Sequence, residues 1–248
     1  CLDADLYENW TDVSGFLSAD PRIVQNPRAI GRITFDEMRE LSYMGASVLQ
    51  EEAIFPVREA NIPIQIKNTN RPEDTGTVIR ETADGDVSEH LITGIAGKKD
   101  FLAIHVKKAH MSNEVGVISR ALNIVERYGV SVEHIPTGVD SFGIVVNASD
   151  VKDTVYSIIS DIRREIEPDD ITMVDRLALV SVVGRNMSRR SGTSGKIFGA
   201  LGNAGVNIRM ITQSSEEISI IVGVDNTDFD RTIGVIYNGF VRDEMVSR

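Results

Sequence analysis

The chain has 248 residues, of which 42% are hydrophobic and 25% are charged, as in an ordinary globular protein. Its 26 Lys and Arg residues against 37 Asp and Glu residues give a net charge of −11. This charge argues against a nucleic-acid partner, whose phosphates need a basic surface, and against docking on an anionic membrane. No apolar run approaches the roughly 18 residues of a membrane span, and we recognise no signal peptide.

The single cysteine, Cys1, allows no internal disulfide and favours a reducing compartment, so we expect a cytoplasmic protein. Because the chain opens on Cys1 rather than on methionine, we expect a fragment of a longer protein or missing residues before it. The sequence contains no Walker A loop, no His-Glu-x-x-His pattern and no cysteine pair for zinc. We therefore expect no metal site formed by these residues.

Three stretches of the chain differ in character. Residues 1–80 contain five of the seven prolines and have the pattern of an irregular α/β fold. Residues 81–90 are polar and acidic, which indicates a linker or an exposed loop. Residues 91–248 alternate β-branched runs with amphipathic helical patterns.

The third stretch contains an internal repeat. Its copies are offset by 76 residues, which separate Gly129-Val130-Ser131-Val132 from Gly205-Val206-Asn207-Ile208. The same offset relates Met111 to Met187, Gly116 to Gly192, Leu122 to Phe198, Ile135 to Ile211, and 144–146 to 220–222. Repeated matches at one offset imply two copies of one supersecondary unit.

The first copy predicts the order βαββαβ, a four-stranded antiparallel sheet with two helices on one face. The expected elements are a strand at 101–107, a helix with an apolar face from Val115 to Tyr128, strands at 130–137 and 142–147, a helix capped by Ser149 or Asp150 and reaching about Glu165, and a strand at 171–174. Gly129 is expected to end the first helix.

The second copy predicts strands at 177–183, 206–212 and 217–224 and helices at about 194–204 and 228–239. It lacks a last strand, because residues 241–248 are polar and charged. The upstream run 91–96 can supply that strand, which would insert the first copy within the second. We therefore predict domains at 1–80, at 101–174, and at 91–97 together with 177–240.

The repeat also suggests a binding site. In each copy a glycine-containing loop leads to a helix N-terminus, whose unpaired N–H groups can hold the carboxylate of a small molecule. Glu133, on the adjacent strand of the first copy, can take an amine, so the two together suggest an amino-acid pocket. The alternative is that Glu133 is a solvated strand residue.

A second candidate site lies in the run from Trp10 to Arg22, where a strand leads into a tight turn. Asp12 can bind ribose hydroxyls, and Arg22 can bind phosphate through its guanidinium fork. The alternative is a turn held by a local Asp20–Arg22 pair. The four histidines, His90, His105, His110 and His134, are scattered, and a structural role is favoured for them over metal binding.

The run from Thr11 to Arg22 resembles the Thr-Asp-Val-x-Gly-x-x-x-x-Asp-Pro-Arg motif of the aspartokinase family. The resemblance continues through 40–49, 62–64, 67–69 and 76–77. The repeat resembles the tandem ACT domains of that family, with 192–211 and 213–216 in the second of them. The resemblance therefore covers nearly the whole chain.

This resemblance implies an α+β chain that contains the C-terminal portion of an amino-acid-kinase α/β domain followed by two ferredoxin-like ACT domains, the first inserted in the second. It implies transfer of the γ-phosphoryl group of ATP to L-aspartate with Mg²⁺, at the start of lysine, threonine and methionine biosynthesis. The family's Lys-Phe-Gly-Gly and Arg-Gly-Gly-Ser-Asp segments, with the catalytic residues, are expected upstream of Cys1. The chain alone is therefore expected to be inactive.

The resemblance also implies roles for particular residues. The expected nucleotide contacts are Thr11, Asp12, Asp20 and Arg22. Ser47 stands where many members carry a lysine, and Gln50 replaces a frequent histidine, so a cationic contact from this loop to ATP is in doubt. The expected contacts of the feedback amino acid are Met111, Gly116, Val117, Ile118 and Glu133, the last where aspartate is usual.

The implied effector is a feedback amino acid; we favour L-lysine, with L-threonine, or both, as the alternative. The implied assembly is a homodimer or higher homo-oligomer formed through the ACT domains. A non-catalytic amino-acid sensor or regulatory subunit is the alternative. Another enzyme with ACT domains fits less well, because residues 10–22 carry the kinase motif.

Overall fold

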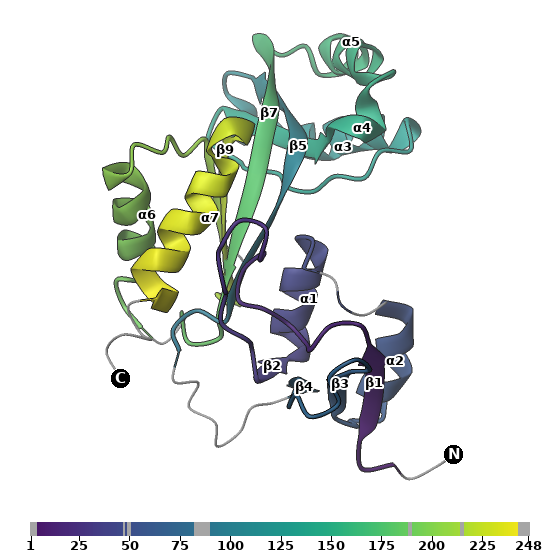
Figure 1. Ribbon diagram of the computed structural model, residues 1–248. Helices are drawn as coiled ribbons and strands as arrows, with labels where there is room; N and C mark the ends of the chain where they lie inside the picture. The colour runs from purple at the N-terminus through teal and green to yellow at the C-terminus, as the bar shows by residue number, and fades with distance from the viewer. Residues whose placement is uncertain are drawn as a thin grey trace. The chain divides into compact units, whose positions relative to one another are not determined.

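The computed structural model describes residues 4–46, 48, 51–81, 90–187, 190–213 and 216–242. The chain divides into two compact units, one formed by Cys1–Lys98 with Val180–Arg248 and the other by Lys99–Leu179 (Figure 1). Most of the predicted linker, at 82–89, and the two departures at Ser47 and Gln50 lie outside the described residues. No helix in the described ranges is long and apolar enough to cross a membrane.

The N-terminal part of the first unit is a small mixed sheet with two helices. Its elements are β1 (Tyr7–Thr11), β2 (Arg32–Thr34), α1 (Phe35–Tyr43), α2 (Glu51–Glu59), β3 (Ile64–Asn68) and β4 (Thr77–Arg80). The strand order is β1-β3-β4-β2, with β1 parallel to β3, β2 parallel to β4, and β3 antiparallel to β4. The mixed sheet agrees with the predicted remnant of an α/β domain.

Local sequence explains how these elements begin and which faces they bury. In β3, Ile64 and Ile66 are fully buried and alternate with half-buried residues, as a strand with one face on a core requires. Helix α1 begins with a capping box, in which the Thr34 hydroxyl accepts from the Glu37 N–H and the Glu37 carboxylate accepts from the Thr34 N–H.

Two long strands, β5 (Gly94–Lys107) and β7 (Asp170–Val183), each contribute to both units. The sequence predicted two shorter strands in place of each, because polar residues interrupt the apolar pattern. In the structure both strands continue through these interruptions, where Asp100 and Arg176 adopt φ values of 68° and 54°. The polar residues therefore mark a backbone irregularity within each strand and not its end.

The second unit contains the first copy of the repeat. Besides parts of β5 and β7 it contains α3 (Val117–Arg127), β6 (Ser141–Asn147), α4 (Ala148–Val151) and α5 (Val155–Ile166), and β6 pairs antiparallel with β5. Its core lies between the sheet and the apolar faces of α3 and α5, with Ile104, Ile124, Ile144, Ile158 and Ile162 among its buried side chains. Gly129 follows α3 with a φ of 67°, as predicted for the residue that ends it.

Two predictions for this copy were wrong in detail. Residues 130–137 do not form a regular strand but pair with β6 through isolated bridges at His134 and Thr137. Pro136 lies between these bridges and has no N–H to donate, which explains the interrupted ladder. The helix after β6 is capped by Asn147, whose side-chain oxygen accepts from the Ser149 N–H, and not by Ser149 or Asp150.

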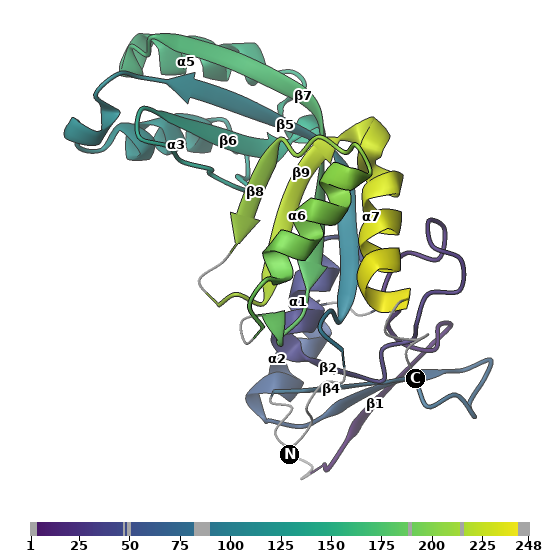
Figure 2. The ribbon, with the colours of Figure 1, turned by 90° about the vertical axis from the view of Figure 1, so that its left-hand side faces the viewer.

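The second copy lies in the first unit, where β5 and β7 are followed by β9 and β8 in the strand order. Its elements are α6 (Thr193–Asn203), β8 (Met210–Gln213), β9 (Ser219–Asp225) and α7 (Phe229–Tyr237), and Figure 2 shows α6 and α7 on one face of these strands. The Thr93 N–H donates to the Val183 carbonyl, so the run upstream of the first copy does join this sheet. The insertion predicted from the sequence is confirmed.

The structure also refines the repeat. Gly116 and Gly192 precede their helices with φ values of 82° and 84°, so the offset of 76 holds there. In the hairpins, however, His134 bridges Val145 whereas Met210 pairs with Gly223. The second strand of the hairpin is therefore shifted by two further residues, and 144–146 corresponds to 222–224 instead of 220–222.

Candidate functional site

The first candidate site lies in the first unit, where β1 and β3 end side by side. Thr11, the last residue of β1, is paired in register with Asn68, the last residue of β3. Ligands of α/β sheets bind outside the carboxyl ends of such strands. Residues that follow these two ends line a cavity of about 620 Å³, a usual size for a small-molecule pocket.

Three of the four predicted nucleotide contacts line this cavity: Asp12, Asp20 and Arg22. Thr11 is not among the lining residues, but its hydroxyl donates to the Asp12 carboxylate over 3.1 Å. The tight turn at Gly15 has a φ of 103°, and a side chain at Gly15 would overlap Thr77. Glycine is thus required for the loop to reach the cavity in this conformation.

Asp20 and Arg22 form the local pair that the sequence offered as the alternative. The Asp20 carboxylate accepts from the Arg22 backbone N–H at 2.8 Å and from its Nη2 at 2.6 Å. The hydrogen bond from the Arg22 side chain lowers the pKa of Asp20. The Arg22 side chain is nevertheless 87% exposed, and both residues line the cavity. The role of Arg22 in phosphate binding stays a prediction.

Sequence reasoning missed a polar chain on the cavity wall. Asn68 Nδ2 donates to Ser14 Oγ over 2.8 Å, and Ser14 Oγ donates to the Asp74 carboxylate over 2.5 Å. All three residues line the cavity, and Asn68 is only 3% exposed. A hydrogen-bonded chain of this kind, with the buried Asn68 at one end, holds its members in fixed positions. No motif announces it, since Ser14 and Asn68 are 54 residues apart.

The cavity is also lined by the loop after α1 and by the second copy of the repeat. These residues include Gly45, Ala46, Ile95, Gly97, Phe229 and Ile233. The backbone of β5 contacts the loop after β1 directly, because the Ile95 N–H donates to the Ser18 carbonyl over 2.8 Å. The second copy therefore helps to form the cavity wall.

The predicted effector residues in the second unit fall into two groups. Met111 and Val117 are buried in the core, Ile118 packs against it, and Gly116 precedes α3, whose first turn has no side-chain cap. Glu133 lines a separate shallow groove of about 740 Å³ beside α3. Of the five residues, Glu133 alone lines this groove.

An ion-pair cluster that sequence reasoning missed fixes the loop before α3. The Glu114 carboxylate pairs with Lys108 at 3.2 Å and with Arg120, and the Lys108 hydrogen bond lowers the pKa of Glu114. Lys108 Nζ also donates to the Ile166 carbonyl at the end of α5 over 2.7 Å. The cluster thus joins the loop to α3 and to the end of α5.

Among the described residues, no three or more His, Cys, Asp or Glu side chains lie together as a group that could hold a metal ion.

Comparison with protein families gives two matches. The amino acid kinase family matches residues 1–68, and the ACT domain matches residues 180–240. The first match contains the loop after β1, and the second contains the second copy of the repeat. The loop after β1 and the second copy of the repeat thus match two different known domain types.

Individual proteins resemble the whole chain. Aspartokinase 3 of Bacillus subtilis is 39% identical over 99% of this chain and 54% of its own length. The crystal structure of Clostridium acetobutylicum aspartate kinase superposes with a TM-score of 0.92 and 52% identity, over 96% of this chain and 55% of that one. A structure of aspartokinase alpha and beta subunits matches with a TM-score of 0.54 and 30% identity, over 60% of this chain and 97% of that one. The chain spans about half the length of the first two proteins.

Proposed function

This chain belongs to the aspartokinase family, and we propose that the protein containing it transfers the γ-phosphoryl group of ATP to the β-carboxylate of L-aspartate, giving 4-phospho-L-aspartate. The observation that carries the proposal is the cavity at the carboxyl ends of β1 and β3, lined by the motif residues of 12–22. The chain spans about half of its relatives, so the remaining catalytic groups would come from outside it.

In this proposal the cavity holds the nucleotide. The Asp12 carboxylate accepts hydrogen bonds from the ribose hydroxyls, and Arg22, held by Asp20, places a guanidinium near the phosphates. Mg²⁺ neutralises phosphate charge when it is bound. Because Mg²⁺ is usually held by one or two carboxylates together with substrate phosphates, a nucleotide-borne ion needs no cluster of three ligands from this chain.

The second unit is proposed to bind a feedback amino acid, L-lysine, as part of a homodimer. The uncapped first turn of α3, behind Gly116, presents backbone N–H groups to the α-carboxylate, and Glu133 accepts from an ammonium group. A second chain is expected to complete the site, because the groove that Glu133 lines does not include Gly116. Residues 133–138 pair with β6 along one edge, and such an edge can pair with another copy.

One observation favours a second candidate, a regulatory subunit without catalytic activity. The chain covers 97% of a solved chain of the aspartokinase alpha and beta subunits at 30% identity. A polypeptide that matches 60% of this chain can therefore be a separate chain. Residues 4–81 and their cavity would then serve to bind a catalytic partner.

A coupled assay of ADP release separates the two candidates. The isolated 248-residue chain should show no turnover with aspartate and ATP. The full-length protein should show turnover, and Asp12→Asn should reduce it mainly by raising the KM for ATP. Absence of turnover in the full-length protein would favour the regulatory subunit. Turnover by the isolated chain would contradict the proposed division of the catalytic site.

Two binding measurements test the regulatory part. Calorimetric titration should show binding of L-lysine and weaker or no binding of L-threonine. Sedimentation at micromolar concentration should show a dimer or larger assembly, and a monomer with and without lysine would contradict the proposed site.

A further inference from the structure

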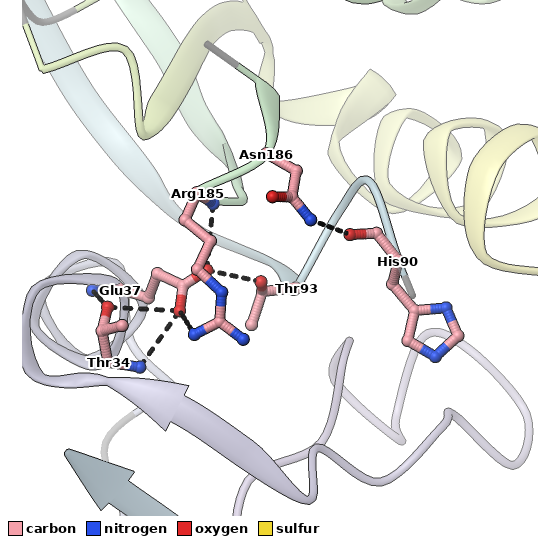
Figure 3. A network of polar contacts seen from close by, with 6 residues as sticks. All are labelled: Thr34, Glu37, His90, Thr93, Arg185 and Asn186. Atoms are coloured by element: carbon pink, nitrogen blue, oxygen red, sulfur yellow. Dashed lines mark hydrogen bonds and ion pairs between the residues drawn. The ribbon is translucent and has the colours of Figure 1, made fainter. Parts of the chain in front are cut away.

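Helix α1 carries a buried carboxylate, Glu37, beside the start of β5 and the end of β7. Glu37 has no exposed surface, although it is ionisable and lies in the first turn of the helix. Only β5 and β7 carry the chain into and out of the second unit. Thr93 directly precedes β5, and Arg185 follows β7 by two residues. Both of them bind Glu37 (Figure 3).

The contacts of Glu37 engage both of its oxygens. Oε1 accepts from the Thr93 hydroxyl at 2.6 Å and from the Arg185 backbone N–H at 3.0 Å. Oε2 accepts from Arg185 Nη1 at 3.2 Å, and from the Thr34 N–H at 3.0 Å and its hydroxyl at 3.2 Å. A buried carboxylate is stabilised only while such donors surround it.

The same elements lead to the cavity. Gly45 and Ala46 follow the end of α1, and Ile95 and Gly97 belong to the start of β5; all four line the cavity. The first residue of β5, Gly94, lies so close to α1 that an added Cβ would be 2.9 Å from a methyl carbon of Leu41. A displacement of the first residues of β5 would therefore disturb both α1 and the cavity wall.

We propose that Glu37 is a positioning residue that couples amino-acid binding in the second unit to nucleotide affinity in the cavity. The carboxylate joins the ends of both connecting strands to α1, so these three elements keep or lose their arrangement together. Moving one strand end alone would leave a buried charge with fewer donors, which is strongly unfavourable. The inference rests on the proposed function, because it takes lysine and nucleotide as the two ligands.

The measurable quantity is the ratio of the lysine Kd values with and without saturating ADP, determined by calorimetry on the full-length protein. Allosteric coupling commonly changes such affinities by roughly 5- to 150-fold. Glu37→Gln keeps the shape of the side chain but removes its charge. It also places an amide N–H group opposite the Thr93, Arg185 and Thr34 groups that donate to Glu37. Thr93→Val removes only the hydroxyl that binds Oε1, and it serves if Glu37→Gln does not fold.

Thr232→Val is the matched control. Thr232 is as buried as Thr93, but its hydroxyl donates to the Asp228 carbonyl within its own segment of the chain. Thr93→Val and Thr232→Val should lower the melting temperature by similar amounts. Only Thr93→Val and Glu37→Gln should move the coupling ratio toward one, by about threefold or more, while the lysine Kd without ADP stays within about twofold.

A coupling ratio that is the same in both test variants as in the unmutated protein would overturn the inference, and so would an equal loss of coupling in Thr232→Val. If the unmutated protein binds lysine and ADP with a ratio of one, there is no coupling for Glu37 to carry and the inference fails while the proposed sites stand. If the unmutated protein binds no lysine, the proposed function fails first and the inference with it.

Discussion

In the first copy of the repeat, Lys108 and Glu114 hold the loop before α3, whereas the second copy has Gly184 and Arg190 at the matching positions. Lys108 anchors its loop to the end of α5. Gly184 instead lets the backbone of Leu91 approach so closely that a side chain would overlap it. One position thus serves a polar cluster in the first copy and close packing beside β5 in the second.

The hairpins differ in the same way. Glu133 of the first copy corresponds to Arg209 of the second, whose guanidinium binds Asp225 over 2.9 Å. Asp225 corresponds to Asn147, and both cap the segment that follows through a side-chain oxygen. In the second copy, therefore, the charge of Arg209 is paired with Asp225 of the same copy. The proposed ligand contact at Glu133 in the first copy thus has, as its counterpart in the second copy, a residue whose ion pair lies within the fold.

The largest expected effect tests this difference at the hairpin. Glu133→Gln should weaken lysine binding by about 10-fold or more, because a hydrogen bond to a charged group contributes roughly 1.5–3 kcal/mol. Arg209→Gln should change it far less, since Arg209 would repel an ammonium group. Calorimetric titration of both variants gives the two Kd values. Equal losses would show that the copies do not differ as ligand sites.

A smaller effect is expected at the glycines that precede the helices. Gly116→Ala and Gly192→Ala should each lower the free energy of unfolding by roughly 1–2 kcal/mol, because both backbones are left-handed. Neither added methyl group meets an atom closer than 3.6 Å. Urea unfolding should therefore report similar losses. Only Gly116→Ala should also weaken lysine binding, by about threefold or more, and an equal effect of Gly192→Ala would contradict this.

The glycines beside the helices and the long strands show which parts of the fold can be predicted from the sequence. Gly129 was identified as the end of α3 because helix boundaries depend on nearby residues, whereas the start of α3 was predicted at Val115 and lies after Gly116. The continuity of β5 and β7 was missed, because pairing with neighbouring strands outweighs the local polar interruptions. The strand predicted at 130–137 was wrong for a similar reason, since its pairing with β6 is reduced to isolated bridges on either side of Pro136.

The candidate sites depend even more on contacts that the sequence does not reveal. The motif of 12–22 identified three residues that line the cavity. The Ser14–Asn68 contact joins residues 54 apart, and the Glu37–Arg185 contact joins residues 148 apart. Nothing in the local sequence of either partner specifies the other, so only the folded chain reveals these contacts.

The smallest expected effect concerns Glu114, which has an arginine as its counterpart in the second copy. Because its pKa is lowered in the folded chain, its ion pairs stabilise the fold above the ordinary glutamate pKa of about 4.3 and lose this effect as the pH falls through the lowered value. The melting temperature of Glu114→Gln should thus lie slightly below that of the unmutated chain at pH 7 and converge with it under acid conditions. Thermal melts from pH 7 to pH 3 test this, with Arg190→Gln as a control that should show no such convergence.

The insertion of one copy within the other has a consequence for the order of folding. The second unit, Lys99–Leu179, is one continuous segment, whereas the first unit must bring together segments on either side of it. Contacts between residues near in sequence form faster, so we expect amides of α3 to gain protection before those of α6 in pulsed hydrogen exchange. Once folded, the inserted unit takes the place of a long flexible loop in the outer copy. The entropic cost of closing such a loop grows only by about 0.6 kcal/mol for each doubling of its length. The outer copy therefore loses little stability through its interruption, but its formation has to wait for the segment that divides it.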